Sequence, residues 1–182
     1  MVIVDELEVA DPADAWTQAG FSVGVDAVCR IGGVGIRLIG RDHGTGIVGW
    51  SLSGLPSDGS LHDVDGVRTT KSEALPATPG THANGVTAIE LGGQPIRQIF
   101  FRLGEVIVEV VGSPETAGEG PSTLWGITYV VADIDATATF FGDRTAPVKD
   151  AVQPGRRITT LRHREFGMSV PSALISPPIL GA

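Results

Sequence analysis

The sequence predicts an α+β fold in which strand-helix-strand-strand-strand (βαβββ) modules form curved mixed or antiparallel sheets with few short helices. Segments of about six to nine residues rich in Val, Ile, Leu and Thr recur between Gly, Pro and Asp-Gly turns, as strands joined by turns do. The 25 glycines and 12 prolines are too many for long helices. The third observation is internal repetition, which indicates several copies of one unit.

Two stretches of the chain recur. Residues 9–15 are repeated as 131–137, each time as a strand end, an aspartate and the start of a short helix that closes on glycine. RIGGVGIRLIG at 30–40 aligns without gaps on RLGEVIVEVVG at 102–112, and more loosely on FGMSVPSALIS at 166–176. We therefore expect related modules that share a core.

The same patterns place each element in chain order. Strands are expected at 2–9, 22–29, 31–39, 46–53, 86–90, 97–103, 105–111, 126–131, 156–163 and 168–175. The first helix is expected to begin after Asp11, a favourable N-cap, with Pro12 at its first position, and to end at Gly20. The second is expected to begin after Asp133 and to end at Gly142 in the same way.

These elements predict three regions. Residues 1–54 form a first complete βαβββ module. Residues 55–85 are rich in Gly, Pro, Ser and Asp, and are expected to be a linker or a loop that folds over a pocket, because long structureless runs are unusual inside a compact domain. Residues 86–182 contain an incomplete module at 86–112, without a helix, and a complete module at 124–176.

Composition excludes several classes of partner. With 13 Lys and Arg against 21 Asp and Glu, the net charge is −8, which argues against nucleic acid. No stretch approaches the ~20 apolar residues of a membrane span. The acidic N-terminal stretch does not resemble a secretory signal, and the single cysteine, Cys29, excludes an intrachain disulfide. A cytoplasmic protein is therefore expected.

The repeats and their contents resemble the vicinal oxygen chelate (VOC) superfamily, the glyoxalase-like proteins built from paired βαβββ modules. The matching segments are THANGVTAIE, FFRLGEVIVEVVG, LWGITYVVADIDATATFFGD, APVKDAVQPGRRITTLRHREFG and VPSALISP. Relatives of this type carry a strand and a helix between GVTAI and FFRLGE. Glu90 and Leu91 stand here where those relatives have an Asp-His pair, so the resemblance implies an internal deletion in the middle module.

Metal-dependent VOC proteins hold their ion with His or Glu on the first and last strands of each module. The matching first-strand positions are Val4, Leu91 and Gly126, and the last-strand positions are Arg37, Glu109 and either Ser172 or Ala173. Only Glu109 has a carboxylate, whereas a catalytic metal site needs about three protein ligands. The resemblance implies a divalent metal in other members, but no cofactor and no metal ligand are predicted for this chain.

The resemblance implies that the protein acts on or binds a small hydrophobic or carboxylated metabolite in a sheet cavity. As an enzyme it would be a lyase or isomerase with Glu109 as the catalytic base, although Glu109 can equally be an exposed strand carboxylate. The alternative is a non-enzymatic module that binds or sequesters a small ligand, as drug-binding relatives do. A structural remnant without a ligand is the third hypothesis.

Six further residues are candidates for ligand binding. His82, Gln153 and Arg157 are expected to orient the ligand, and His163 lies on the same predicted strand face as Arg157. The aromatic candidates for the cavity wall are Trp50 and Trp125. In each case the simpler alternative is structural: solvent-exposed or core histidines, arginines of 156–164 paired with neighbouring acids, and tryptophans packed in the core.

The missing strand and helix also predict a partner. Without them a sheet edge is left unpaired, and proteins normally cover such an edge. We therefore expect a homodimer.

Overall fold

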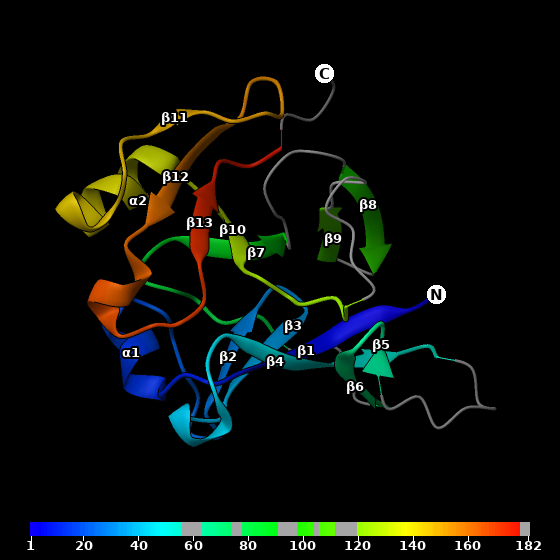
Figure 1. Ribbon diagram of the computed structural model, residues 1–182. Coiled ribbons are helices and arrows are strands. Elements are labelled where there is room, and N and C mark those ends of the chain that lie inside the picture. Colours follow the sequence, from blue (N-terminus) through cyan, green and yellow to red (C-terminus); the bar gives the residue numbers. More distant parts are fainter. Residues whose placement is uncertain (56–62, 74–77, 91–97, 104–105, 112–119, 179–182) are drawn as a thin grey trace.

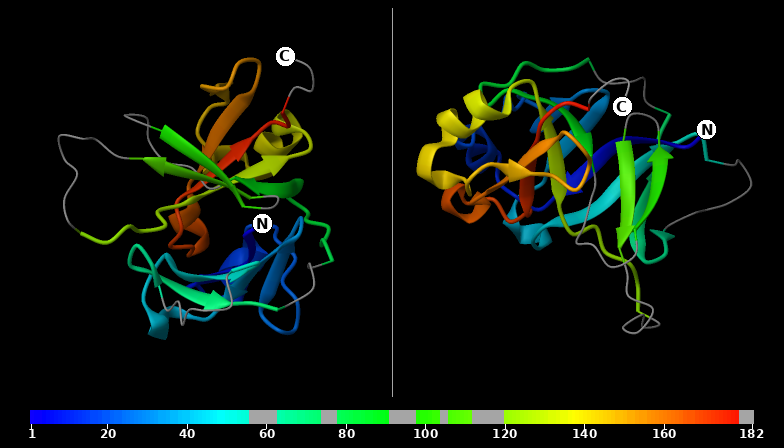
Figure 2. Two further views of the ribbon diagram at one scale, coloured as in Figure 1. Left: turned by 90° about the vertical axis from the view of Figure 1, so that its right-hand side faces the viewer. Right: turned by 90° about the horizontal axis from the view of Figure 1, so that it is seen from above.

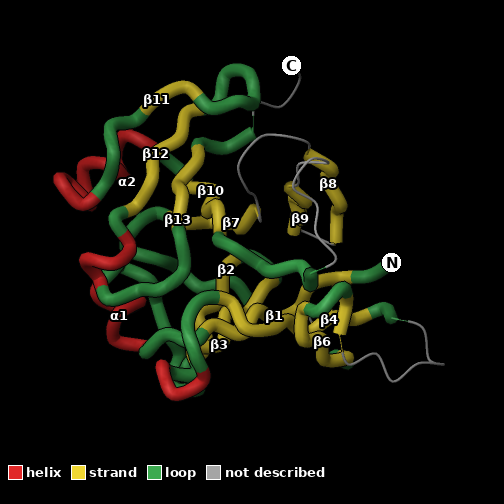
Figure 3. Tube along the Cα trace, viewed as in Figure 1, coloured by secondary structure: helices red, strands yellow, loops and turns green. Residues whose placement is uncertain are grey.

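The computed structural model describes residues 1–55, 63–73, 78–90, 98–103, 106–111 and 120–178, with the backbone alone at 98–102 and 109–111. The first half of the chain forms a lower sheet and the second half an upper sheet (Figures 1 and 2). The short helices gather on one side of both sheets (Figure 3). This arrangement confirms the predicted α+β class with mixed sheets and few helices.

The first sheet has the strand order β2-β3-β1-β4-β6-β5. Its strands are β1 (Ile3–Val9), β2 (Val28–Ile31), β3 (Val34–Leu38), β4 (Ile47–Ser53), β5 (Asp63–Val64) and β6 (Val67–Lys71). The second sheet has the order β11-β12-β13-β10-β7. Its strands are β7 (Val86–Glu90), β10 (Ile127–Val131), β11 (Lys149–Asp150), β12 (Arg157–Leu161) and β13 (Ser172–Ile175).

A hairpin and five short helices complete the described elements. The hairpin joins β8 (Gln98–Leu103) to β9 (Val106–Val111), and β9 contacts β7. The α-helices are α1 (Ala13–Gln18) and α2 (Ile134–Phe141), and the 3₁₀ helices are η1 (Arg41–His43), η2 (Gly142–Arg144) and η3 (His163–Phe166). No described helix is long and apolar enough to cross a membrane.

The repeat at 9–15 and 131–137 folds twice in the same way. β1 pairs parallel with β3 and antiparallel with β4, and β10 pairs parallel with β13 and antiparallel with β7. Both antiparallel pairs shift register just before the repeated valine, Val9 or Val131. The next residue then donates its N–H to a glycine carbonyl at 3.0 Å in each copy. The two halves are therefore structural repeats.

The repeat at 30–40 and 102–112 also folds twice alike. Ile31 pairs with Val34 at the end of the β2–β3 hairpin, and Leu103 pairs with Val106 at the aligned position of the β8–β9 hairpin. The middle copy thus keeps its hairpin without a helix before it among the described residues.

The structure differs from the predicted strands most clearly in two places, and in addition β13 starts only at Ser172 and β11 was not predicted. Residues 22–29 were expected to form a strand, but β2 begins only at Val28, and the residues before it contribute a single bridge, from Val23 to Cys29. Ala27 takes a left-handed conformation (φ 58°) in the turn between these two residues. The tract predicted as a linker contains β5 and β6, and β6 pairs parallel with β4. The boundaries 1–54, 55–85 and 86–182 stay predictions, as do the homodimer and the cytoplasmic location.

The two repeated aspartates behave differently. Asp133 caps α2 as predicted, accepting hydrogen bonds from the N–H groups of Asp135 (2.9 Å) and Ala136 (3.0 Å). The predicted cap of α1 is wrong, because Pro12 is extended (φ −78°, ψ 148°) and the helix starts only at Ala13. Asp11 then lies outside the helix, and its side chain is free for other contacts.

The core lies between the inner faces of the two sheets. Leu7 and Ile36 of the first sheet and Leu174 of the second are fully buried there. The rings of Trp16 and Phe21 pack against Tyr129 of β10, at centroid distances of 6.4 and 5.1 Å. The halves therefore share one core.

The hydroxyl of Tyr129 is buried close to the Ser172 side chain but forms no hydrogen bond of standard geometry with a described residue, and burial raises the pKa of the phenol. Because a buried unpaired hydroxyl costs about 1–3 kcal/mol, we expect Tyr129→Phe to unfold at an equal or higher urea concentration. Tyr129→Ala should instead lose about 3–5 kcal/mol, since it opens a cavity. A clear loss of stability in Tyr129→Phe would show that the hydroxyl has a partner.

Candidate functional site

His82 joins the segment before β7 to the first half. Its Nδ1 accepts the N–H of Ser22 (3.0 Å), which leaves the ring proton on Nε2, and this N–H donates to the carbonyl of Arg30 (2.9 Å). The side chain is buried, and burial lowers the pKa of the imidazole. Both ring nitrogens form hydrogen bonds inside the protein, which gives His82 a role in packing, and its expected role in orienting a ligand stays a prediction.

The hydrogen bonding and burial of His82 predict that the stability of the protein depends on pH. The pKa of His82 in the folded state lies below the unfolded value of about 6.5. When the pH falls below about 6.5, the unfolded state therefore binds the proton first. The free energy of unfolding decreases over this range until His82 of the folded state is protonated as well. We expect wild type to lose more stability between pH 7 and pH 5 than His82→Gln, in urea unfolding. His43→Gln, at an exposed histidine, is the control. Equal losses in all three proteins would contradict the prediction.

The neighbours Arg156 and Arg157 point in different directions. Arg157 is exposed and pairs with Asp135 of α2 (2.5 and 3.0 Å). Arg156 is buried: its Nη1 contacts both carboxylate oxygens of Glu90 (3.0 and 3.2 Å), and its Nε and Nη2 donate to the carbonyl of Ser176 (2.9 and 2.7 Å). The alternative that these arginines pair with acidic neighbours is therefore correct for both.

Glu90 belongs to a row of side chains on the outer face of the second sheet. Its partner in β10 is Thr128, whose partner in β13 is Ala173, which in turn pairs with Thr160 of β12. Residues paired across strands share a face. The adjacent row, which contains Tyr129, faces the core, so this row faces away from the core and its members are partly exposed.

The ion pair of Glu90 and Arg156 connects the two sides of that face. β7 and β12 are separated by β13 and β10 in the strand order, so the Arg156 side chain reaches across two strands to meet Glu90. The Glu90 side chain keeps 19% of its surface exposed, against 8% for Arg156. Glu90 is thus the more accessible partner for a ligand.

The other predicted residues do not converge on this face. Trp50 is buried in the core and donates its indole N–H to Thr69 (2.7 Å), whereas Trp125 is 60% exposed. Gln153 lies in an exposed turn. His163 begins η3, where burial lowers the pKa of its half-buried ring. The side chain of Glu109 lies outside the described residues, so its role as a base stays a prediction.

Four of the positions carried over from metal-dependent relatives have a described side chain that is neither a carboxylate nor an imidazole: Val4, Arg37, Ser172 and Ala173. Val4 is buried in the core, and Arg37 makes a bidentate ion pair with Glu6 of β1 (2.7 and 2.8 Å). Ala173 lies on the outer face, and Ser172 faces inward. Among the described residues no three His, Cys, Asp or Glu side chains gather to hold an ion. Burial raises the pKa of the Cys29 thiol to about 12, which suits a core residue.

Sequence reasoning missed Asp11, whose buried carboxylate ties the halves together. Both of its oxygens accept the N–H of Ser169 (2.9 Å), and Oδ2 also accepts the indole N–H of Trp16 (3.2 Å). Arg41 lies 3.5 Å from Oδ1. Ser169 in turn accepts the N–H of Gly46 on its hydroxyl (2.7 Å). Since Ser169 comes from the second half and the others from the first, Asp11 lies at the seam between the halves.

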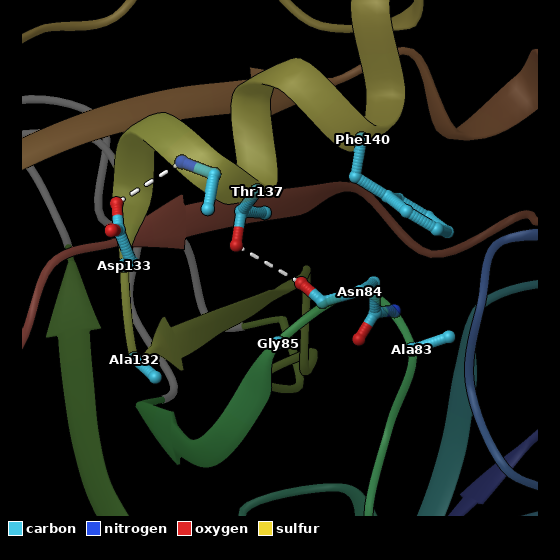
Figure 4. A pocket seen from close by; sticks show the side chains of 8 residues that line it. Ala83, Asn84, Gly85, Ala132, Asp133, Thr137 and Phe140 are labelled. Carbon is cyan, nitrogen blue, oxygen red and sulfur yellow. Dashed lines mark hydrogen bonds between the residues drawn. The ribbon is translucent and has the colours of Figure 1, made fainter.

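One described cavity, of about 310 Å³, lies beside the start of α2 (Figure 4). The hydroxyl of Thr137 points to the carbonyl of Asn84 (3.0 Å), and the Asn84 amide donates to Ala19 (2.8 Å). Because the polar side chains that close this cavity are already bonded within the protein, they support packing of α2 rather than ligand binding.

Comparisons with known proteins support the fold alone. No family model and no curated protein matches the sequence. The structure is similar to a solved protein described as a "xylose isomerase-like TIM barrel/4-hydroxyphenylpyruvate dioxygenase fusion protein", with a TM-score of 0.54 and 11% sequence identity. The match covers 99% of this chain and 49% of that protein, so the chain spans about half of its length. This likeness concerns the fold and is compatible with the module architecture predicted from the repeats.

Proposed function

We propose that the protein binds a small, largely apolar metabolite on the outer face of its second sheet, and that it binds this molecule without converting it. The observation that supports the proposal is the ion pair of Glu90 and Arg156 on that face. Removing two charges from water is costly, and apolar side chains would serve folding at least as well. A charged pair kept on a sheet face, in a VOC-type fold, therefore favours recognition.

The face suggests the chemistry of the ligand. The N–H groups of Arg156 donate hydrogen bonds to Glu90 and Ser176. The group available to a ligand is therefore the carboxylate of Glu90, which accepts hydrogen bonds. Ile158, which is partly exposed, supplies apolar surface on the same face. The ligand that fits is a small apolar molecule with a hydroxyl group that donates to Glu90.

A thermal-shift screen with pairs of compounds tests this. Each small hydroxylated aromatic or aliphatic compound is compared with its methyl ether, which lacks the donor. We expect the hydroxyl compound to raise the Tm of wild type, and its Kd to rise at least tenfold in Glu90→Gln. Glu165→Gln, an exposed glutamate in an ion pair with Arg162, is the matched control. Equal affinities in both variants would contradict the assignment of Glu90.

The same compounds separate binding from catalysis. Product formation is followed by NMR with and without added divalent ions. A bound compound that stays unchanged supports the binding module. Turnover would overturn the binding proposal in favour of the lyase or isomerase hypothesis, and its loss in Glu109→Gln would then support Glu109 as the base.

A further inference from the structure

A second cavity, of about 340 Å³, lies where η1 of the first half faces η3 of the second half. Its lining consists of Arg41, Thr45, Arg164, Gly167, Met168 and Ser169. None of these residues belongs to the outer face of the second sheet, so the cavity is separate from the face that carries Glu90. Its volume lies within the range of small-molecule sites.

Arg164 has a free charge at this cavity. Seven other described arginines, Arg41 among them, have a carboxylate partner within 4 Å, and Arg144 lies 4.3 Å from the centre of the Phe166 ring. Arg164 is exposed, and its guanidinium has no ion pair, hydrogen bond or ring contact among the described residues. A guanidinium group that has no interaction partner in the surrounding protein is available to bind a ligand.

Arg41 supplies a second, positioned cation. Its Nη2 donates to the carbonyl of Gly167 and lies 3.5 Å from Asp11, so the protein fixes one end of the guanidinium. Nε and Nη1 have no partner in the described part of the chain, which leaves donors for an oxyanion. Asp11 is fully buried behind Arg41 and does not line the cavity.

The remaining polar groups of the cavity also suit an anion. The hydroxyl of Ser169 accepts a hydrogen bond from Gly46, so its own hydrogen is free to be donated. Thr45 adds a second hydroxyl at the rim. Among the described residues no carboxylate lines the cavity, and Asp42, next to Arg41, does not belong to its wall. The wall thus combines two guanidinium groups and two hydroxyl donors, and the largely buried residue Met168 lies beside them.

We propose that the cavity between η1 and η3 is a binding site for a small molecule with an oxyanion group, a carboxylate or a phosphate, held between Arg41 and Arg164. The anion would bridge a residue of the first half and a residue of the second half. The site is independent of the proposed ligand on the second sheet.

Calorimetric titration tests the site with three probes that share one ring: phenyl phosphate, benzoate and, as the neutral control, benzyl alcohol. We expect at least one anion to bind wild type, and to bind more weakly in 0.5 M NaCl because salt screens the arginines. Arg164→Gln should weaken this binding at least tenfold. Arg162→Gln removes the same charge two residues away, outside the cavity wall, and should change the Kd less than threefold.

The outcomes of this titration distinguish the possible ligands and test the proposal. Binding of phenyl phosphate alone identifies a phosphate site, and binding of benzoate alone identifies a carboxylate site. Equal weakening in Arg164→Gln and Arg162→Gln would show a general charge effect and would overturn the proposal, as would tight binding of benzyl alcohol or no binding of either anion. Arg164→Gln removes no internal contact, so the Tm of the free variant should match that of wild type. Glu90→Gln should leave the anion affinity unchanged, which separates this site from the proposed function.

Discussion

Replacing Asp11 with alanine is expected to lower the free energy of unfolding by about 3–5 kcal/mol. The substitution leaves two buried donors without an acceptor, the indole N–H of Trp16 and the backbone N–H of Ser169. It also removes the carboxylate beside Arg41. Because these groups come from both halves, the loss should appear as a lower midpoint of a single urea transition.

Asp133→Ala is the matched control, since Asp133 holds the aligned position of the repeat. It caps α2 only locally, so its loss should cost about 1 kcal/mol. A similar small effect for both substitutions would contradict the role of Asp11 as the link between the halves. Asp11→Asn should fall between wild type and Asp11→Ala, because the amide oxygen keeps one acceptor.

The second large effect is expected at Arg156, where Arg156→Ala should cost about 2–4 kcal/mol. The substitution leaves the Glu90 carboxylate partly buried without its counter-charge and frees the carbonyl of Ser176. Arg156→Lys should recover part of the loss, since an ammonium keeps the charge but not the three-nitrogen contact.

Arg157→Ala tests whether burial causes this effect. Arg157 is the next residue and also forms an ion pair, with Asp135, but the pair is exposed to solvent and salt. We expect no measurable change in the midpoint of urea unfolding for Arg157→Ala. Equal losses at both positions would show that the pair of Glu90 and Arg156 is no more than an ordinary surface contact.

The fold was predictable largely because its signals are local and repeated. The aligned segments 30–40 and 102–112 each become a hairpin of the same register, and Asp133 and Gly142 end α2 as capping chemistry requires. The strands β5 and β6 were missed because polar residues and glycines surround them in the sequence. In addition, β6 pairs with β4, which is distant from it in the sequence.

The candidate site was less predictable because its contacts join distant segments. Arg156 and Glu90 are 66 positions apart, and Asp11 and Ser169 are 158 apart, so no spacing in the sequence reveals either contact. A hint lay in Pro12, which follows Asp11 but has no counterpart after Asp133. An extended proline delays the helix and frees the aspartate from capping. The two backbone partners of His82 come from the first half, so the sequence around His82 did not reveal these contacts.

A chemical-shift map of the ¹⁵N-labelled protein, titrated with the hydroxyl compound that raises the Tm most, tests ligand binding on the second sheet most directly. We predict that the largest saturable shifts will fall on the amides of Glu90, Thr128, Thr160 and Ala173, and that the same titration of Glu90→Gln will shift them far less. Saturable shifts that leave this row unchanged and fall elsewhere would contradict a binding site on that face.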